Sequence, residues 1–423
     1  MEVLRIGLTG TEVMEIQALL EKIGYDPGPI DGIFGTSTQQ AVIEFQKKFG
    51  LTADGIIGED TYRMLQRFFL GYDIYTIGPG DSVYTIARKF GTTINRILTA
   101  NPGLQIYNLR IGQRITVPYG INIVDTNIDY TYDIMERDLQ ALKVRYPFLE
   151  IGTAGNSVLG KNLYYVKLGD GPNKVFYNGA HHGLEWITSV VLMKFIEDFS
   201  EAYANKSNLA GYRVKELWKE SAIYVMPMVN PDGVDLVLNG LSEENPYYQE
   251  LIRWNSGNRD FSRVWQANVR GVDLNHNYDA SWELSKEAEV AYGITGPGPT
   301  RYSGPYPESE PESRAVADFT RKHNFRLVLA YHSQGEVIYW TYSNLTPLES
   351  VEIVERFAEV SGYIPAETYG IVSYAGYKDW FIKEYRRPGF TIEVGRGINP
   401  LPISQFDKIY QDNIGLLLLA AII

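Results

Sequence analysis

The chain has 423 residues, a net charge of −12 at neutral pH and no cysteine. Its length predicts two or three domains rather than one core. The acidic balance argues against nucleic acid or an anionic membrane as the main partner, because both favour basic surfaces, and the absence of cysteine excludes disulfides and thiol catalysis.

Residues 1–70 predict a small helical domain. Apolar residues at helical spacing form three short helices, which are joined by two Asp-Gly-x-x-Gly turns at 31–35 and 54–58. The segment has no catalytic constellation, so the residues alone also fit a helical spacer. Together with Gly24-Tyr25 and Phe45-Gln46, the turns resemble the peptidoglycan-binding domain of bacterial cell-wall hydrolases. That resemblance implies attachment to the wall.

Residues 71–119 predict a second small domain. A short strand, two helices and a closing strand are indicated, with Gly80-Asp81-Ser82 at the first helix start and Asn101-Pro102 ending the second helix. The pattern resembles the LysM domain, which implies binding to the glycan strands of peptidoglycan. A unit of this size has little room for an active site.

Residues 120–423 predict the catalytic domain, reached through a short linker at 118–127 that would allow some swing. A helix is expected at 132–145, and apolar strand runs then alternate with helical ones. This alternation predicts an α/β fold with a mixed sheet covered by helices on both faces. The strands are expected at 164–168, 174–177, 223–228, 327–331 and 390–394.

The central motif is His182-Gly183-Leu184-Glu185, which follows the strand at 174–177 and precedes an expected helix at 187–199. A histidine and a carboxylate three residues apart can bind one divalent metal on a tight turn, and zinc needs a third protein ligand. His332 follows another apolar strand, where an α/β sheet delivers functional side chains. On spacing alone, a surface His/Glu pair is the alternative.

Glu393 is the carboxylate expected to act as general base. It stands inside the predicted strand 390–394, where an unpaired buried carboxylate is unfavourable unless it has a function. Proton transfer beside a metal site is such a function.

These residues resemble the zinc carboxypeptidases over roughly residues 125–423. The resemblance implies one zinc ion per chain, bound by His182, Glu185 and His332, with Glu393 as catalytic base. It also implies that Asp273 hydrogen-bonds the first histidine. Asn268 and one upstream arginine, of which Arg263 is the first choice, would stabilise the oxyanion.

The chain departs from the exopeptidases of this family where they bind a C-terminal carboxylate. Leu184 and His276 stand where arginines are expected, and a neutral imidazole cannot form the bidentate arginine–carboxylate pair. The implied substrate-binding residues are Asn275, His276, Lys378, and either Tyr369 or Tyr374 as the mobile tyrosine. Lys378 could equally be a solvated surface lysine. The loop at 297–311 is expected either to shape a cleft or to be a surface connection.

With its two N-terminal modules, the chain resembles the bacterial γ-D-glutamyl-L-diamino acid endopeptidases of this family. That resemblance implies cleavage between γ-D-glutamate and meso-diaminopimelate in peptidoglycan stem peptides. Two alternatives remain: a carboxypeptidase with another terminal specificity, and a catalytically silent wall-binding protein.

The expected partners are peptidoglycan glycan strands and stem peptides, without nucleic acid or membrane. Residues 1–7 lack the basic and apolar regions of a signal peptide, and the apolar run 414–423 is too short to span a bilayer. Without an export signal, the resemblance to sporulation-linked members of this family implies a location in the cytoplasm of a sporulating bacterium, or at its spore or cell wall.

Overall fold

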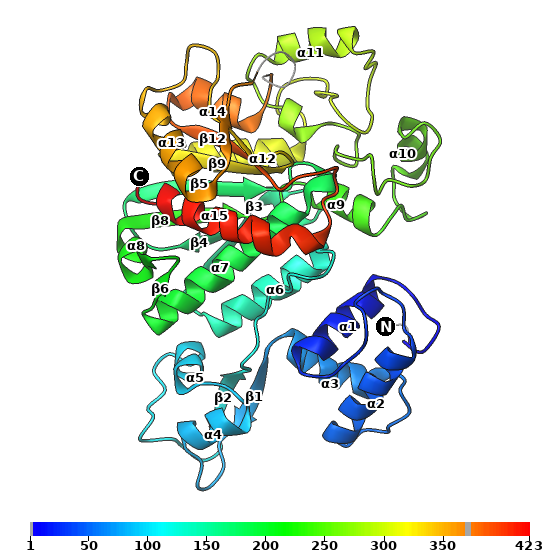
Figure 1. Cartoon of the computed structure of the whole chain (residues 1–423), viewed down its shortest axis with the longest axis vertical. Helices are drawn as coiled ribbons and strands as arrows, with labels where there is room; N and C mark the ends of the chain where they lie inside the picture. The colour runs from blue at the N-terminus through cyan, green and yellow to red at the C-terminus, as the bar shows by residue number, and fades with distance from the viewer. Residues whose placement is uncertain (1–2, 369–373) are drawn as a thin grey trace. The chain divides into compact units, whose positions relative to one another are not determined.

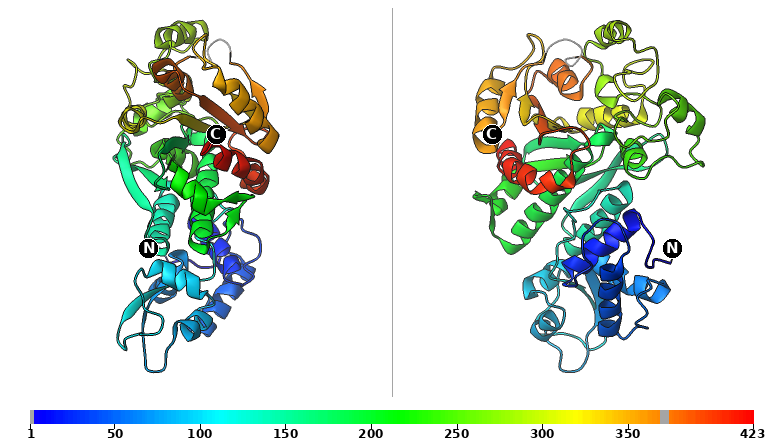
Figure 2. Two further views of the ribbon diagram at one scale, coloured as in Figure 1. Left: turned by 90° about the vertical axis from the view of Figure 1, so that its left-hand side faces the viewer. Right: turned by 45° about the vertical axis from the view of Figure 1, so that its right-hand side comes forward.

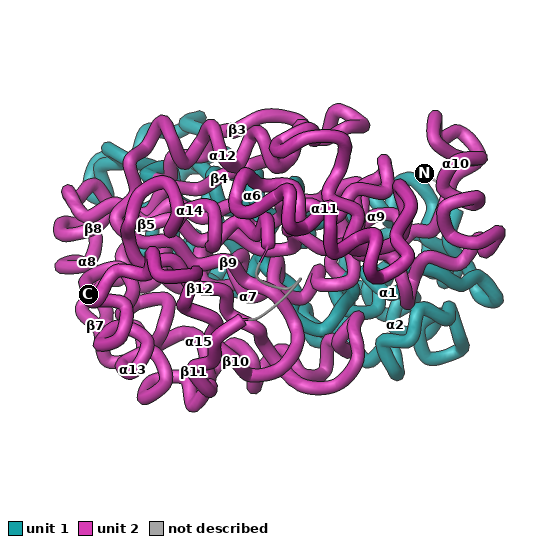
Figure 3. Tube along the Cα trace, turned by 90° about the horizontal axis from the view of Figure 1, so that it is seen from above, with its two compact units in different colours: residues 1–129, 134–148 teal, residues 130–133, 149–423 magenta. Residues whose placement is uncertain are grey.

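The computed structural model describes residues 3–368 and 374–423 (Figure 1). It divides into two compact units, which Figure 3 distinguishes by colour. The first unit comprises Met1–Asp129 and Ile134–Phe148, and the second comprises Tyr130–Asp133 and Leu149–Ile423.

The first unit begins with the expected three-helix domain. Its helices are α1 (Thr11–Lys22), α2 (Thr36–Phe49) and α3 (Glu59–Phe69), packed around a shared apolar core. Two buried glutamines fix the two Asp-Gly turns in the same way. Gln17 accepts from the Gly32 N–H and donates to Asp31 Oδ1, while Gln46 accepts from the Gly55 N–H and donates to Asp54 Oδ1.

The LysM-like domain has the expected order of β1 (Tyr72–Thr76), α4 (Val83–Lys89), α5 (Ile94–Ala100) and β2 (Arg114–Pro118), with the two strands antiparallel. Ser82 and Thr85 form a capping box at the start of α4. Asn101 ends α5 and ties it to β2, because its side chain both donates to and accepts from the Thr116 backbone.

The segment 118–127, interpreted from the sequence as a swinging linker, is hydrogen-bonded within the first unit. Lys22 donates to the Ile123 carbonyl at 3.2 Å and forms an ion pair with Asp125. Helix α6 (Tyr132–Arg145) spans the division between the units. At its end, the buried Arg145 donates to the Gly71, Tyr119 and Ile121 carbonyls. These bonds hold the segment 118–127 and the end of α6 within the first unit.

The second unit is built on an eight-stranded mixed sheet with the order β11-β10-β12-β9-β5-β8-β4-β3. The four central strands β12, β9, β5 and β8 are parallel, and antiparallel pairs join them to β10 and β4. The strands are β3 (Glu150–Asn156), β4 (Asn162–Leu168), β5 (Asn173–Gly179), β8 (Ser221–Met226), β9 (Leu327–Ser333), β10 (Val337–Tyr339), β11 (Ile364–Ala366) and β12 (Gly389–Val394).

Helices cover both faces of this sheet (Figure 2), as the sequence predicted. On one face Phe176 packs with residues of α12 and α14, and on the other the Tyr177 hydroxyl donates to the Leu417 carbonyl of α15. The remaining elements are α7 (Ile187–Asn205), α8 (Val214–Glu220), α9 (Pro231–Leu238), α10 (Tyr248–Trp254), α11 (Trp282–Ala291), α12 (Pro311–His323), α13 (Glu349–Ser361), α14 (Tyr377–Tyr385), α15 (Phe406–Ala420) and the short pair β6 (Asn208–Leu209) and β7 (Tyr212–Arg213).

All five strands expected in the catalytic domain form, with bounds shifted by a few residues. The strands of this sheet that were not expected are β3, β10 and β11, and the separate short pair β6 and β7 was not expected either. Strand β3 lies at the edge of the sheet and is only partly buried, so it lacks an apolar run, while β10 and β11 have three residues each. Among the described helices, none has the length and apolar character needed to cross a membrane.

Candidate active site

The His182–Glu185 motif lies on a short 3₁₀ turn, Gly183–Glu185, between the carboxyl end of β5 and α7. Close backbone packing against Gly233 fixes this turn. A Cβ on Gly183 would approach the Gly233 carbonyl oxygen to 2.6 Å, so only glycine fits. Asn230, in the Asn-Pro-Asp-Gly sequence, caps α9 and donates to the His181 carbonyl. The turn is therefore held from the neighbouring loop.

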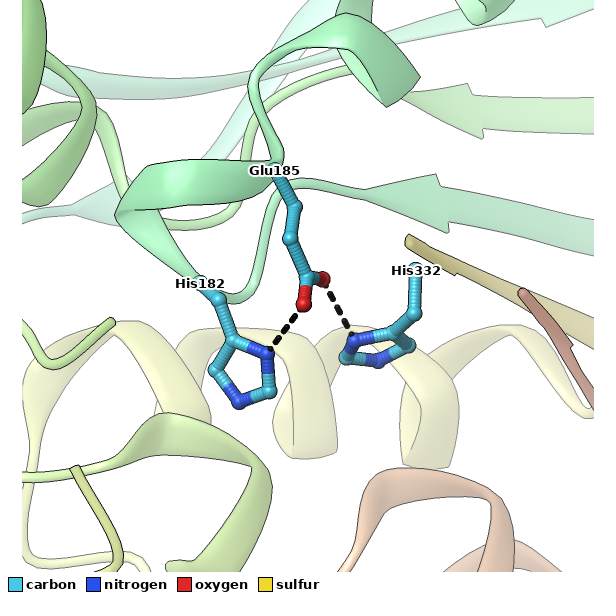
Figure 4. Close-up of side chains that lie close together, drawn as sticks. All are labelled: His182, Glu185 and His332. Atoms are coloured by element: carbon cyan, nitrogen blue, oxygen red, sulfur yellow. Dashed lines mark hydrogen bonds and ion pairs between the residues drawn. The ribbon is translucent and has the colours of Figure 1, made fainter. Parts of the chain in front are cut away.

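The three predicted metal ligands converge (Figure 4). Glu185 Oε1 lies 2.9 Å from His182 Nδ1, and Glu185 Oε2 lies 2.8 Å from His332 Nδ1. One ligand atom from each residue falls within 4.8 Å of the others. Two imidazole nitrogens and a carboxylate at this spacing, with a cavity beside them, match the donor set of a catalytic zinc site.

Electrostatics favour the ionised form of Glu185. Burial alone would raise the pKa of Glu185, but His182 and His332 lower it to about 2, which keeps the carboxylate ionised. His181 is fully buried and its Nε2 lies 3.0 Å from the Tyr278 hydroxyl. Desolvation, followed by the adjacent histidines, lowers its pKa well below the ordinary value. His181 is thus a neutral core residue and not a fourth ligand.

Asp273 occupies the position behind His182 that the sequence predicted. Its Oδ1 accepts from His182 Nε2 at 2.9 Å, and its Oδ2 accepts from the Arg301 backbone N–H at 2.8 Å. Burial opposes the charged carboxylate, yet His182 and His276 hold the pKa of Asp273 far below its usual range. With a metal bound, a carboxylate on Nε2 would leave the Nδ1 lone pair of His182 to serve as the ligand atom.

Asn399 contacts the ligand set without any signal in the sequence. Its amide donates to Glu185 Oε1 at 3.4 Å and to the Ser333 carbonyl at 2.6 Å, while its Oδ1 accepts from the Ser333 hydroxyl at 2.8 Å. Asn399 lies in a loop five residues after the end of β12. Its contact with Glu185 cannot be predicted from the spacing of residues in the sequence.

Glu393 stands beside this cluster. Strands β9 and β12 are parallel, and their register places Glu393 opposite His332. The side chain is half-buried and lines the same cavity. Burial and then the charge of Glu185 raise the pKa of Glu393 well above its ordinary value. A raised pKa brings a carboxylate closer to the range in which it both accepts and returns a proton.

His182, His332 and Glu393 line a cavity of about 230 Å³. Of the predicted substrate-binding residues, Asn275, His276 and Lys378 line it. Tyr374 does not, although its carbonyl lies 3.1 Å from His276 Nδ1, and Tyr369 is outside the described residues. Further lining residues that sequence reasoning missed are Gln266, Thr300, Arg301, Tyr339, Thr368, Gly376, Asp379 and Thr391.

Lys378 is buried rather than solvated, with 3% of its surface exposed. Its ammonium donates to the Thr341 carbonyl at 2.6 Å and forms an ion pair with Asp379, which is equally buried. Desolvation raises the pKa of Asp379, and the lysine opposes that shift. The cavity therefore contains a buried pair of opposite charges.

The two predicted oxyanion residues do not line the cavity. Arg263 is exposed. Asn268 is fully buried, where its amide donates to Glu310 and Glu312 and its carbonyl accepts from the Arg270 and Val272 N–H groups. Through these bonds, the Asn268 side chain holds the loop that leads to Asp273.

Glu312 gives a prediction about pH and stability. It is fully buried, and desolvation raises its pKa from 4.5 to about 8, with Asp232 adding to the shift. The folded protein therefore holds a proton that the unfolded chain releases between these two values. Stability should fall as pH rises through this window, by up to about 1.4 kcal/mol per unit. Thermal unfolding from pH 5 to 9 should show this slope, and Glu312→Gln should flatten it. An unchanged slope in the variant would contradict the assignment.

Three protein-family models match successive parts of this chain. A zinc carboxypeptidase family model matches residues 135–415, preceded by a peptidoglycan binding domain at 9–65 and a LysM domain at 75–118. Among relatives, the chain is 44% identical over 394 residues to gamma-D-glutamyl-L-diamino acid endopeptidase 1 of Lysinibacillus sphaericus, covering 81% of this chain and 98% of that protein.

Two further similarities extend the comparison. The uncharacterized protein YqgT of Bacillus subtilis is 34% identical over 327 residues, covering 76% of this chain and 86% of that protein. Among solved structures, bovine thrombin-activatable fibrinolysis inhibitor in complex with tick carboxypeptidase inhibitor has the same fold, with a TM-score of 0.52 at 22% identity, covering 70% of this chain and 97% of that one. With the converging ligands and the matched models, the chain belongs to the zinc carboxypeptidase family.

Proposed function

We propose that this protein is a zinc peptidase that hydrolyses the bond between γ-D-glutamate and the L-centre of meso-diaminopimelate in peptidoglycan stem peptides. The similarity to the γ-D-glutamyl-L-diamino acid endopeptidase of Lysinibacillus and the two wall-binding modules support this substrate.

The observation that carries the proposal is that neither of the two positions where exopeptidases of this family place carboxylate-binding arginines holds an arginine here, since they are Leu184 and His276. Leu184 is buried at 4% exposure. His276 lies in the cavity, and desolvation lowers its pKa, so it is neutral at physiological pH. Neither side chain can form the charged two-point contact by which an exopeptidase would recognise a free chain end.

His182, Glu185 and His332 would hold the metal. When bound there, zinc supplies a Lewis acid for the scissile carbonyl and for a water molecule. Glu393 takes a proton from water in the cavity and returns it to the leaving amine. Asp273 keeps His182 in the tautomer that presents Nδ1, and Asn399 holds one oxygen of Glu185 in place.

Lys378 would bind the distal carboxylate of diaminopimelate. Its position in the cavity and its buried ion pair with Asp379 support this assignment. Asn275 lines the same cavity, and its Oδ1 accepts from the Tyr377 N–H at the start of α14. The mobile-tyrosine role stays a prediction for Tyr369 or Tyr374, and the oxyanion role stays a prediction for Arg263 and Asn268.

The two N-terminal modules would keep the enzyme on peptidoglycan. Tethering raises the effective concentration of a catalytic unit on an insoluble polymer. We further propose that the enzyme acts at the cell or spore wall of a sporulating bacterium. The wall-binding modules support the wall location. The sporulation setting rests only on the resemblance to sporulation-linked members of the family.

Digestion of L-Ala-γ-D-Glu-meso-diaminopimelate by the zinc-loaded protein tests the proposal. We expect release of free diaminopimelate, detected by mass spectrometry, and no removal of C-terminal residues from ordinary α-linked peptides. Intact stem peptide together with trimmed ordinary peptides would instead establish a carboxypeptidase. If neither substrate changes while isolated cell walls still bind the protein, the catalytically silent alternative would hold.

A further inference from the structure

Arg301 lies in the loop 297–311 and lines the cavity beside Gln266 and Thr300. It is the one arginine among the described lining residues. This loop was expected either to shape a cleft or to be a surface connection, and its contribution to the cavity supports the first interpretation. The guanidinium lies close enough to His276 for its charge to help lower the pKa of that imidazole.

The backbone of Arg301 is anchored to the ligand set. Its φ of 63° is left-handed, a conformation that a non-glycine residue adopts at some energetic expense. In this conformation the Arg301 N–H donates to Asp273 Oδ2, and the same carboxylate accepts from His182 through Oδ1. The side chain therefore starts from a point fixed relative to the reacting centre.

The two cations of the cavity differ in their partners. Lys378 is paired with Asp379 and bonded to the Thr341 carbonyl. Arg301 has no carboxylate within salt-bridge distance in the part of the chain that the structure describes, and its guanidinium lies 5.4 Å from the centre of the Tyr292 ring. One cation is thus neutralised by the protein, whereas the other is available to an anion of the substrate.

This arrangement matches the charges of the proposed substrate. The D-centre of diaminopimelate carries both an ammonium and a carboxylate, which suits the Lys378–Asp379 pair. The γ-linked glutamate carries a lone carboxylate on its α-carbon, because the scissile amide uses the side-chain carboxyl. An ordinary α-linked residue has a peptide group in place of that anion. A planar guanidinium binds such a carboxylate through two hydrogen bonds.

We propose that Arg301 binds the α-carboxylate of the γ-D-glutamyl residue and thereby selects γ-linked glutamate on the acyl side of the scissile bond. This inference rests on the proposed function and adds a specificity-determining residue to it.

The test compares two stem peptides: L-Ala-γ-D-Glu-meso-diaminopimelate, and its D-isoglutamine counterpart, in which the α-carboxylate is a carboxamide. We expect the wild type to favour the carboxylate form by about 10- to 100-fold in kcat/KM, chiefly through KM, the effect of losing a charged hydrogen bond. Arg301→Gln should lower kcat/KM for the carboxylate form to the wild-type value for the amide form, and should leave the amide form almost unaffected.

Arg259→Gln is the matched control, because Arg259 is exposed, lies outside the cavity lining and contacts only the Tyr248 ring among the contacts described. It should keep the wild-type preference. A third peptide has L-lysine in place of diaminopimelate and so lacks the distal carboxylate. It distinguishes recognition of that distal carboxylate from recognition of the glutamyl α-carboxylate.

Three outcomes would overturn the inference. Arg301→Gln could lose discrimination between the diaminopimelate and lysine peptides, which would place Arg301 at the other end. It could lower kcat equally for the carboxylate and amide forms, which would indicate an oxyanion role. It could also keep the wild-type preference. If the wild type cleaves none of the peptides, the proposed function itself fails, a result distinct from all three.

Discussion

Replacing Glu393 by glutamine is expected to lower kcat by about 10²- to 10⁴-fold, the usual effect of removing a general acid–base group. Glu393 lines the cavity and is opposite His332 in the β9–β12 register. Glutamine keeps the size and the hydrogen-bonding capacity of the side chain, but it cannot take up a proton. The hydrolysis rate of the stem peptide would be measured together with zinc content and unfolding temperature.

The second and third measurements separate catalysis from folding. Glu393→Gln should bind one zinc per chain and unfold near the wild-type temperature, because Glu393 is not among the converging ligands. Glu355→Gln, on the exposed surface of α13, is the matched control and should keep full activity. A Glu393→Gln variant that retains more than about a tenth of wild-type kcat would exclude the general-base role.

Removal of zinc by a chelator is expected to abolish hydrolysis and to lower the unfolding temperature. The ligands come from the turn after β5 and from β9, so the ion would connect two segments far apart in sequence. A ligand that binds only the folded state stabilises it by about 2.7 kcal/mol when its free concentration is 100 times its Kd. Calorimetry of the apo and zinc-restored protein would measure the shift.

Glu185→Ala provides the control for zinc removal. It deletes the central ligand, so its unfolding temperature should not respond to chelator or to added zinc. Re-addition of zinc should restore activity to the wild-type apoprotein alone. If the apoprotein kept its hydrolytic activity, the three converging residues would not be a catalytic metal site.

The convergence of His182, Glu185 and His332, and the place of Glu393 beside them, could be predicted because each residue has a local sequence signal. His182 and Glu185 are three residues apart on one turn, and both His332 and Glu393 stand in apolar strands that neighbour each other in the sheet. A strand pattern fixes which residues are buried and where the strand ends, and in this fold the strand ends carry the site.

The cavity wall was harder to predict, because loops form it. Arg263 was the first choice among the arginines before Gly271, yet it is exposed, while Gln266 three residues later faces the cavity. Arg301 comes from a different loop, held by its backbone contact with Asp273. The hydrophobic periodicity of the sequence does not predict that Gln266 and Arg301 face the cavity, because tertiary hydrogen bonds decide which loop residues turn inward.

Lys378 illustrates the limit of judging burial from sequence. A lysine followed by an aspartate is typical of a solvated helix start, and that alternative was left open. In the structure both side chains are buried and neutralise each other. Burial of one partner without the other would be strongly unfavourable. The burial of Lys378 therefore depends on that of Asp379, and neither residue type alone predicts it.

The contacts of helix α6 affect how the chain can be divided or recombined. Its Arg137 forms an ion pair with Glu15 at 2.6 Å, and its Arg145 bonds to the carbonyls of Gly71 and Tyr119. A catalytic fragment beginning at residue 120 would leave both guanidinium groups without these partners. Exchange of binding modules between such enzymes, in the laboratory or in evolution, would therefore have to preserve the acceptors for this helix and not only the sequence of the linker.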